Sequence, residues 1–525
     1  MTAAVETSRS LTGLAAIHGS FYRWILIAVL VTGAIGTMLA ATIVNVALPA
    51  IIGAFGLGQD QAQWLSTAFL TSSTGFMLLN TWAIASFGMR TSFIAAMCVF
   101  IAGSFIGATS QGLEILVLGR VLQGAGAGLI QPMAMVLIFR VFPERSRGTA
   151  IGLYSLGVIL SPAFGPVVGG ALIDMFDWRF VFVATTPLTL LAIPLAIIFL
   201  PGREESGARP RLDWQGLVLV IAALALMLQG LAHGHREGWD DTGAILRLAG
   251  AAVCAAVFLL WENRHPFPVL NLRLFANPGF SLAALVILLT GLAVYGSTYL
   301  VPLFVQLIQH YSPTGAGLIL APAGLAMVIG FPLAGRLSDH VDARILLGLG
   351  VAMFGLSMLL MSGLSTFAPF GAMAAWVALS RIGIATVMPA ANASAMRQVD
   401  PAMLGFAAPA ATFLTQTGGA LGVAGLSVLL QERAAFHIDA MAPLVSEANP
   451  QAMEALARLR AGLSEAGISD YAATLQAGQQ LALSMWTSAQ ALAFRDCFFL
   501  IACAFAALFL VIPLIPPGHG RGKSP

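Results

Sequence analysis

Charged side chains are scarce in this sequence. Asp, Glu, Lys and Arg make up 9% of its 525 residues, and Lys523 is the only lysine, whereas soluble globular proteins contain about 25% charged residues. Hydrophobic residues make up 58%. Apolar stretches of roughly twenty residues, each long enough to cross a membrane, recur from Trp24 to Pro516. The sequence therefore excludes a soluble protein and predicts an all-α polytopic membrane protein.

Cysteine is scarce too, and it forms no ligand pattern. The four cysteines all fall inside apolar runs, without Cys-x-x-Cys spacing: Cys98, Cys254, Cys497 and Cys503. This predicts small buried hydrophobic residues. We expect no metal site, no cofactor and no enzymatic activity, because no metal set, nucleophile triad or phosphate loop occurs at a plausible depth. The net charge of +2 gives no basis for nucleic-acid binding.

Charges, prolines and polar clusters predict about fourteen transmembrane helices. We expect them near residues 24–50, 62–82, 91–110, 114–138, 146–172, 179–200, 213–232, 243–262, 278–306, 314–337, 343–363, 366–391, 403–430 and 494–516. The predicted organisation is an N-terminal tail (1–23), a six-helix bundle (24–200), an inserted helix pair (213–262), a second six-helix bundle (278–516) and a C-terminal tail (517–525). An even number of spans places both termini on one side. With the N-terminus inside, inner segments carry sixteen Lys and Arg residues and outer segments seven, which favours cytoplasmic termini.

An internal repeat supports the division into two halves. Pro132, Arg140 and Gly148 are eight residues apart, and Pro389, Arg397 and Gly405 repeat this spacing. Two parallel six-helix repeats are typical of transporters whose substrate site lies near the membrane midplane, between the halves.

One arginine falls inside the fourth predicted helix. "LGRVLQGAGAGLIQP" places Arg120 and Gln123 on one helix face and Gln131 further along, among glycines that allow close helix packing. An arginine within the membrane indicates a functional site. The alternative is an arginine that extends to the membrane surface, since Arg120 lies only a turn or two from the outer end.

The fifth predicted helix is rich in glycine and proline. "SPAFGPVVGG" contains Gly165, Pro166, Gly169 and Gly170. Such a helix is deformable and thin on one side, and a tight packing seam is the alternative interpretation.

Together these motifs resemble those of the major facilitator superfamily. "LGRVLQGAGAG" and "SPAFGPVVGG" look like its fourth-helix and antiporter motifs, and "GRLSDHVDAR" looks like its cytoplasmic loop motif. "ATIVNVALPAI", with Asn45, and "TFLTQTGGALGVA", with Gln416, are similar to the fourteen-helix drug:proton antiporter branch, particularly EmrB-type efflux pumps. The resemblance covers nearly the whole chain. It implies a multi-pass protein of the bacterial inner membrane.

The loop motif implies a cytoplasmic gate. Asp339 with Arg336 and Arg344, beside Gly335, could form a charge network that breaks when the halves move; ordinary positive-inside charge is the alternative. In the first-half copy, "TWAIASFGMR", Ala85 stands at the corresponding position. Any latch must therefore depend mainly on the second copy.

A carboxylate that the resemblance leads one to expect is missing. Similar proteins usually have an Asp five residues before Asn45, where this chain has Ala40. Arg120 cannot replace it as a proton carrier because arginine stays charged. Three hypotheses follow: Glu114 or Asp174 at the outer mouth couples protons, the substrate supplies the negative charge, or coupling to protons is weak.

The segment 431–493 is the largest extracytoplasmic piece. Met453, Leu456, Leu459 and Leu463 recur at helical spacing and predict an amphipathic helix. EmrB-type pumps carry a similar insertion and work with a periplasmic membrane-fusion adaptor and an outer-membrane channel, so we expect an adaptor to dock here. A helix lying on the membrane surface is the alternative.

The sequence thus predicts a secondary active exporter of amphipathic drugs or toxic compounds, with anionic ones among the candidates. It would work by alternating access and proton antiport. The alternatives are a weakly coupled or uncoupled exporter of an endogenous metabolite, and a receptor or assembly platform that has kept the fold.

Overall fold

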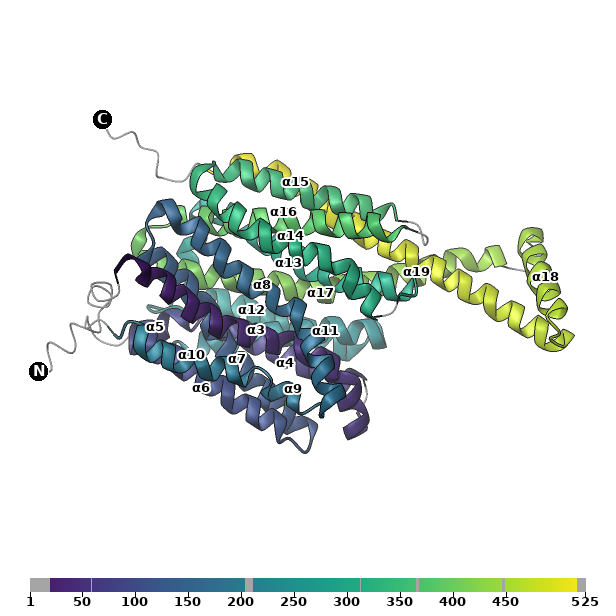
Figure 1. Ribbon diagram of the computed structural model, residues 1–525, viewed down its shortest axis with the longest axis horizontal. Coiled ribbons are helices and arrows are strands. Elements are labelled where there is room, and N and C mark those ends of the chain that lie inside the picture. Colours follow the sequence, from purple (N-terminus) through teal and green to yellow (C-terminus); the bar gives the residue numbers. More distant parts are fainter. Residues whose placement is uncertain are drawn as a thin grey trace, which may run out of the picture.

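The computed structural model describes residues 19–57, 59–203, 211–311, 313–364, 368–445 and 449–516, and these ranges contain helices and no strand. The long helices run side by side, with the start of α3 and the end of α19 at one end of the bundle and α18 beyond the other (Figure 1). We call these the inner and the outer end. Asp339 and Asn45 lie in described helices, but their side chains fall outside the described part.

The first half comprises α3 (Tyr22–Phe55), α4 (Gln59–Met77), α5 (Asn80–Phe87), α6 (Met89–Ala108), α7 (Leu113–Val141), α8 (Glu144–Met175), α9 (Phe180–Val183) and α10 (Thr186–Phe199). The inserted pair is α11 (Trp214–Glu237) and α12 (Thr242–Glu262). The second half comprises α13 (Pro278–Leu307), α14 (Pro313–His340), α15 (Ala343–Ser362), α16 (Phe370–Arg397), α17 (Leu404–Met441), α18 (Pro450–Glu465) and α19 (Asp470–Val511). Short 3₁₀ turns, η1 to η5, lie between or beside these helices.

Within the described ranges, eleven helical segments are long and apolar enough to cross a membrane. They coincide with eleven of the fourteen predicted spans. The other three predicted spans, 62–82, 146–172 and 314–337, coincide with α4, α8 and α14, of which α14 contains a shorter apolar segment, Pro322–Ser338. The all-helical membrane architecture is therefore confirmed.

Three of the predicted spans differ in detail from the helices of the structure. The second predicted span breaks between α4 and α5, and the sixth breaks between α9 and α10, where Pro187 occupies the first turn of α10. Proline lacks a backbone N–H, so it is favoured at a helix start. The last helix begins at Asp470, well before the predicted residue 494.

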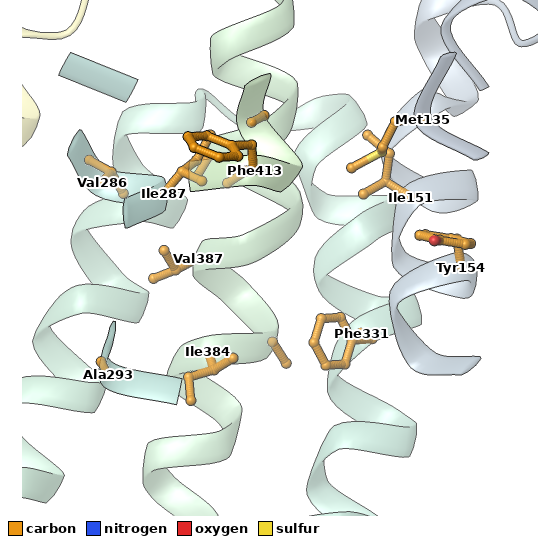
Figure 2. Packing of buried hydrophobic residues seen from close by; sticks show 14 of the residues in the cluster. Met135, Ile151, Tyr154, Val286, Ile287, Ala293, Phe331, Ile384, Val387 and Phe413 are labelled. Atoms are coloured by element: carbon orange, nitrogen blue, oxygen red, sulfur yellow. The ribbon is translucent and has the colours of Figure 1, made fainter. Parts of the chain in front are cut away.

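The two halves meet closely at the inner end. A Cβ at Gly152 of α8 would overlap the carbonyl oxygen of Phe331 in α14, so only glycine permits this approach of the two backbones. Figure 2 shows Phe331 beside the helix that carries Ile151 and Tyr154, within a continuous buried apolar cluster. On the other side of the bundle, the hydroxyl of Thr81 in α5 donates to the carbonyl of Gly405 in α17. The inner end is therefore closed.

The inserted pair contacts both halves. Gly75 of α4 lies against Ile221 of α11, and the indole of Trp239, between α11 and α12, donates to Glu432 of α17 at 2.8 Å. Asp241 caps α12 by accepting from the backbone N–H of Ala244, and this hydrogen bond is the main reason that the pKa of Asp241 is lowered.

Helices α17 and α19 extend past the rest of the bundle at the outer end (Figure 1). With 38 and 42 residues they are about 57 and 63 Å long at 1.5 Å per residue, roughly twice the thickness of a hydrocarbon core. Asp496 of α19 accepts from Arg433 at 2.6 Å and lies 2.8 Å from His437 of α17, which ties the two helices together. The expected amphipathic helix is α18, which packs on the extended part of α19.

Candidate functional site

Arg120 of α7 lies entirely inside the first half, with 0% of its surface exposed. Its Nε donates to the carbonyl of Leu65 at 3.1 Å, and its Nη1 donates to the carbonyl of Ala40 and to Oε1 of Gln123 at 3.1 and 3.0 Å. The guanidinium also lies 4.3 Å above the ring of Phe69, a cation–π geometry. Arg120 thus does not extend to the membrane surface.

The partners of Arg120 are all uncharged. Within the described residues no carboxylate lies within ion-pair distance of its guanidinium, and its Nη2 has no hydrogen-bond partner. A buried charge without a counter-charge is costly unless its hydrogen bonds are satisfied. The carbonyl of Ala40 therefore supplies part of what a carboxylate on the first helix would supply.

The glycines of α7 bring this site together. A Cβ at Gly124 would overlap the carbonyl of Phe69 in α4, and a Cβ at Gly119 would overlap the backbone of Gly107 in α6. The expected close helix packing is present at both contacts. It lets a carbonyl of α4 reach the guanidinium of Arg120.

The two glutamines of α7 occupy different environments. Gln123 accepts from Arg120 and donates to the hydroxyl of Ser104 at 2.9 Å. Gln131 does not join this network: its side chain points to the sulfur of Met38, and its backbone carbonyl accepts from the hydroxyl of Tyr154 of α8. The structure therefore groups Arg120 with Gln123 and separates Gln131 from them.

Among the remaining predicted substrate and coupling residues, those whose side chains are described do not contact Arg120. Glu114 is exposed in the first turn of α7. Gln416 of α17 is buried and accepts from the hydroxyl of Tyr295 of α13. The side chain of Asp174, like that of Asn45, falls outside the described part.

The predicted motif glycines lie in two places. Gly165, Gly169 and Gly170 lie in the outer part of α8, and Gly335 lies in the inner part of α14. Gly165 faces Thr42 of α3, where a Cβ would overlap the threonine hydroxyl; Gly169 is buried, and Pro166 and Gly170 continue the same helix. At the inner end, Gly335 lies against Gly148 and Gly152. The contact of Gly165 with Thr42 is of the kind that the alternative interpretation, a tight packing seam, predicts.

The predicted latch cannot be followed to Asp339, whose side chain lies outside the described part. Arg336 is exposed, and Arg344 is half-buried at the start of α15. Arg397 of α16, a residue of the internal repeat, donates to the carbonyl of Ser338 at 3.2 Å and so binds the inner end of α14.

Two groups of residues were missed in the sequence. Arg381 of α16 is 5% exposed and donates to the hydroxyls of Ser297 and Thr298 of α13. A count could have found it, because 23 of the 25 Lys and Arg residues fall in predicted loops or at helix ends and only Arg120 and Arg381 remain. The second group is a buried carboxylate pair at the inner end of the inserted helices, Asp213 and Glu262, with exposures of 1% and 2%.

Comparison with known proteins identifies the family. The model of the Major Facilitator Superfamily matches residues 30–423. The multidrug export protein EmrB of Escherichia coli K12 is 27% identical over 490 residues, covering 92% of this chain and 94% of that protein. EmrB of Haemophilus influenzae is 26% identical over 487 residues, again with 92% and 94% covered.

Solved structures show the same fold. The human organic anion transporter MFSD10 superposes with a TM-score of 0.61 at 13% identity, covering 93% of this chain and 99% of that one. The proton:xylose symporter XylE, bound to 6-bromo-6-deoxy-D-glucose, superposes with a TM-score of 0.61 at 13% identity, covering 95% and 97%. These likenesses, together with the helical architecture and the family match, show a multi-pass membrane transporter. The chain belongs to the major facilitator superfamily.

Proposed function

We propose that this protein is a secondary active exporter of amphipathic drugs or toxic compounds in a bacterial inner membrane. The EmrB relatives are named as multidrug export proteins, which supports this substrate class. Both termini would face the cytoplasm. The closed inner end would then be the outward-facing state of an alternating-access cycle.

The observation that carries the proposal is the environment of Arg120. It is a fixed positive charge held by the carbonyls of Ala40 and Leu65, with no described carboxylate beside it to take up and release a proton. We infer an antiporter with altered coupling to protons. In similar transporters a carboxylate on the first helix supplies a negative charge, and here an acidic substrate would supply it instead. The outer-mouth acids Glu114 and Asp174 are the remaining proton carriers to test.

Proteoliposomes that contain a pH-sensitive dye test the coupling. Addition of an anionic or a cationic amphipathic compound should produce movement of that compound together with counterflow of protons. Active efflux without proton movement would exclude antiport. Binding without movement of any compound would favour a receptor or platform on the same fold.

A second proposal concerns the outer extension formed by α18 and the first part of α19. Its exposed apolar side chains include Tyr471, Leu475 and Leu483, with exposures of 83%, 56% and 63%. An exposed ion pair between Arg460 and Asp470 joins α18 to the start of α19. We infer that this extension docks a periplasmic membrane-fusion adaptor, which would connect the exporter to an outer-membrane channel.

Replacing residues 442–484 by a short Gly-Ser linker tests this docking. The deletion leaves the contact between Arg433 and Asp496 in place, so insertion into the membrane should persist while pull-down of a co-expressed adaptor is lost. Leu475→Asp combined with Leu483→Asp should give the same loss without a deletion. Retained pull-down in both variants would contradict the proposal.

A further inference from the structure

Arg381 lies deep in the second half. It is the twelfth residue of α16, which places it about 16 Å below the outer end of that helix at 1.5 Å per residue. Its side chain is 5% exposed. An arginine at this depth is costly for a membrane protein, which marks it as a functional candidate.

The partners of Arg381 satisfy its hydrogen bonds without neutralising its charge. Its Nη1 donates to the hydroxyl of Ser297 at 3.2 Å and its Nη2 to the hydroxyl of Thr298 at 3.1 Å. Both hydroxyls donate their own protons to the carbonyl of Val294, so their lone pairs face the guanidinium. Among the residues with described side chains, no carboxylate forms an ion pair with Arg381.

Helix α13 lies beside the two helices through which the second half contacts the first half. Helix α13 packs on both α16 and α17, and these two helices contact α8 and α7 of the first half. Ser297 is fully buried, but Thr298 is exposed. One turn further in, Tyr295 donates to Gln416 of α17 and extends the polar surface on the same face of α13.

The two buried arginines differ in access. Arg120 is 0% exposed and is covered by carbonyls of α3 and α4 and by the ring of Phe69. Arg381 instead has the exposed residue Thr298 as its immediate neighbour, so a ligand that contacts the hydroxyl of Thr298 comes within reach of its guanidinium. Of the two charges, Arg381 is therefore the better placed to contact a transported molecule.

We propose that Arg381, Ser297 and Thr298 form a subsite for the acidic group of an amphipathic substrate. This inference rests on the proposed export function and assigns its anion recognition to the second half. A carboxylate would replace one or both hydroxyls as acceptor from the guanidinium fork, which favours paired hydrogen bonds to planar anions. The aromatic part of the substrate would lie toward Tyr295.

Binding of a matched pair of probes to the purified full-length protein in nanodiscs tests the subsite. Dansylglycine carries a carboxylate, and its methyl ester has the same aromatic group without the charge. The wild-type protein should bind the acid more tightly. Arg381→Gln should weaken acid binding tenfold to a hundredfold, the range of a charge-assisted hydrogen bond, and change ester binding less than twofold. Arg495→Gln, which removes the same charge from an exposed position of α19, serves as the control and should leave both unchanged.

A second variant covers the case in which Arg381→Gln does not fold. Thr298→Asp keeps the arginine and places a carboxylate beside it, so it should abolish the preference for the acid while the ester still binds. Equal binding of acid and ester by the wild-type protein, equal loss of both in Arg381→Gln, or an unchanged acid preference in Thr298→Asp would each overturn the subsite. Failure of the export function would give a different result. The wild-type protein in proteoliposomes would still bind the acid but would transport neither probe.

Discussion

Gly148 of α8 and Gly335 of α14 touch backbone to backbone across the two halves. Gly152 joins the same contact from the next turn of α8. The closed inner end therefore depends on positions where any side chain would force the two helices apart. Gly148 is also one of the landmarks of the internal repeat, and its counterpart Gly405 makes the other inner contact, with Thr81.

Gly335→Ala should open the inner end. The added Cβ would overlap the carbonyl of Gly148, and overpacking of this kind costs about 1–3 kcal/mol, enough to shift a two-state equilibrium about fivefold or more. Spin labels at the exposed inner positions 140 and 340 should report a longer distance by pulsed electron resonance. Gly348→Ala in α15, where a Cβ would make only an ordinary contact with Phe509, is the matched control. An unchanged distance in Gly335→Ala would contradict this account of the closure.

Ala40→Asp should add proton coupling. The carbonyl of Ala40 already accepts from Arg120, and its side chain packs with Phe69, the ring beneath the guanidinium. An aspartate there would place a titratable group beside a fixed positive charge. We expect more protons moved per substrate in proteoliposomes. If proton movement stays as in the wild-type protein while substrate transport persists, the missing carboxylate does not set the coupling.

Gly75→Ala should loosen the inserted pair. A Cβ at Gly75 would overlap the side chain of Ile221 on α11, so the thermal unfolding temperature should fall. Ile221→Ala in the same chain removes the overlapping atoms and should restore much of the loss. Gly324→Ala, where a Cβ would meet nothing within 4 Å, should not destabilise. Absence of rescue by Ile221→Ala would argue that the contact does not hold the pair in place.

Asp213 and Glu262 should behave as a pair that holds one proton. Oδ2 of Asp213 and Oε1 of Glu262 have no hydrogen-bond partner among the described residues, and a Cβ on Gly216 would lie 2.6 and 2.5 Å from them. Nδ1 of His265 lies 3.6 Å from Oδ2 of Asp213. Two buried carboxylates so close repel each other when both are ionised, which favours sharing of one proton. Glu262→Gln mimics the protonated form, so it should keep the wild-type unfolding temperature.

Asp213→Ala should differ from Glu262→Gln. It removes the cap that accepts from the backbone N–H of Gly216 and from the indole of Trp261, and loss of a helix cap costs about 0.5–2 kcal/mol. The unfolding temperature should therefore drop. Equal destabilisation by both substitutions would show that the glutamate must be ionised.

The positions of the helices and of the intramembrane Arg120 could be predicted from the sequence, because both can be recognised from the types of residue present. Apolar length marks the spans, and Arg120 stands out within one of them, as Arg381 does within another. The partners of Arg120 could not be predicted, since they are backbone carbonyls, which every residue possesses. The pairing of Asp213 with Glu262 was equally hidden, because it depends on how the turn between α11 and α12 returns the end of α12 to the start of α11.

The long helix α19 also makes the outer extension a lever. Between Asp470 and Phe494 it measures about 36 Å, and its lower part is packed in the second half beside α17 and α15. A rotation of that half by roughly 10° would move the tip of the lever by about 6 Å if the helix stays straight. In the proposed alternating-access cycle, a molecule bound at the tip would therefore sense, and would resist, a change between open and closed states of a site far below it.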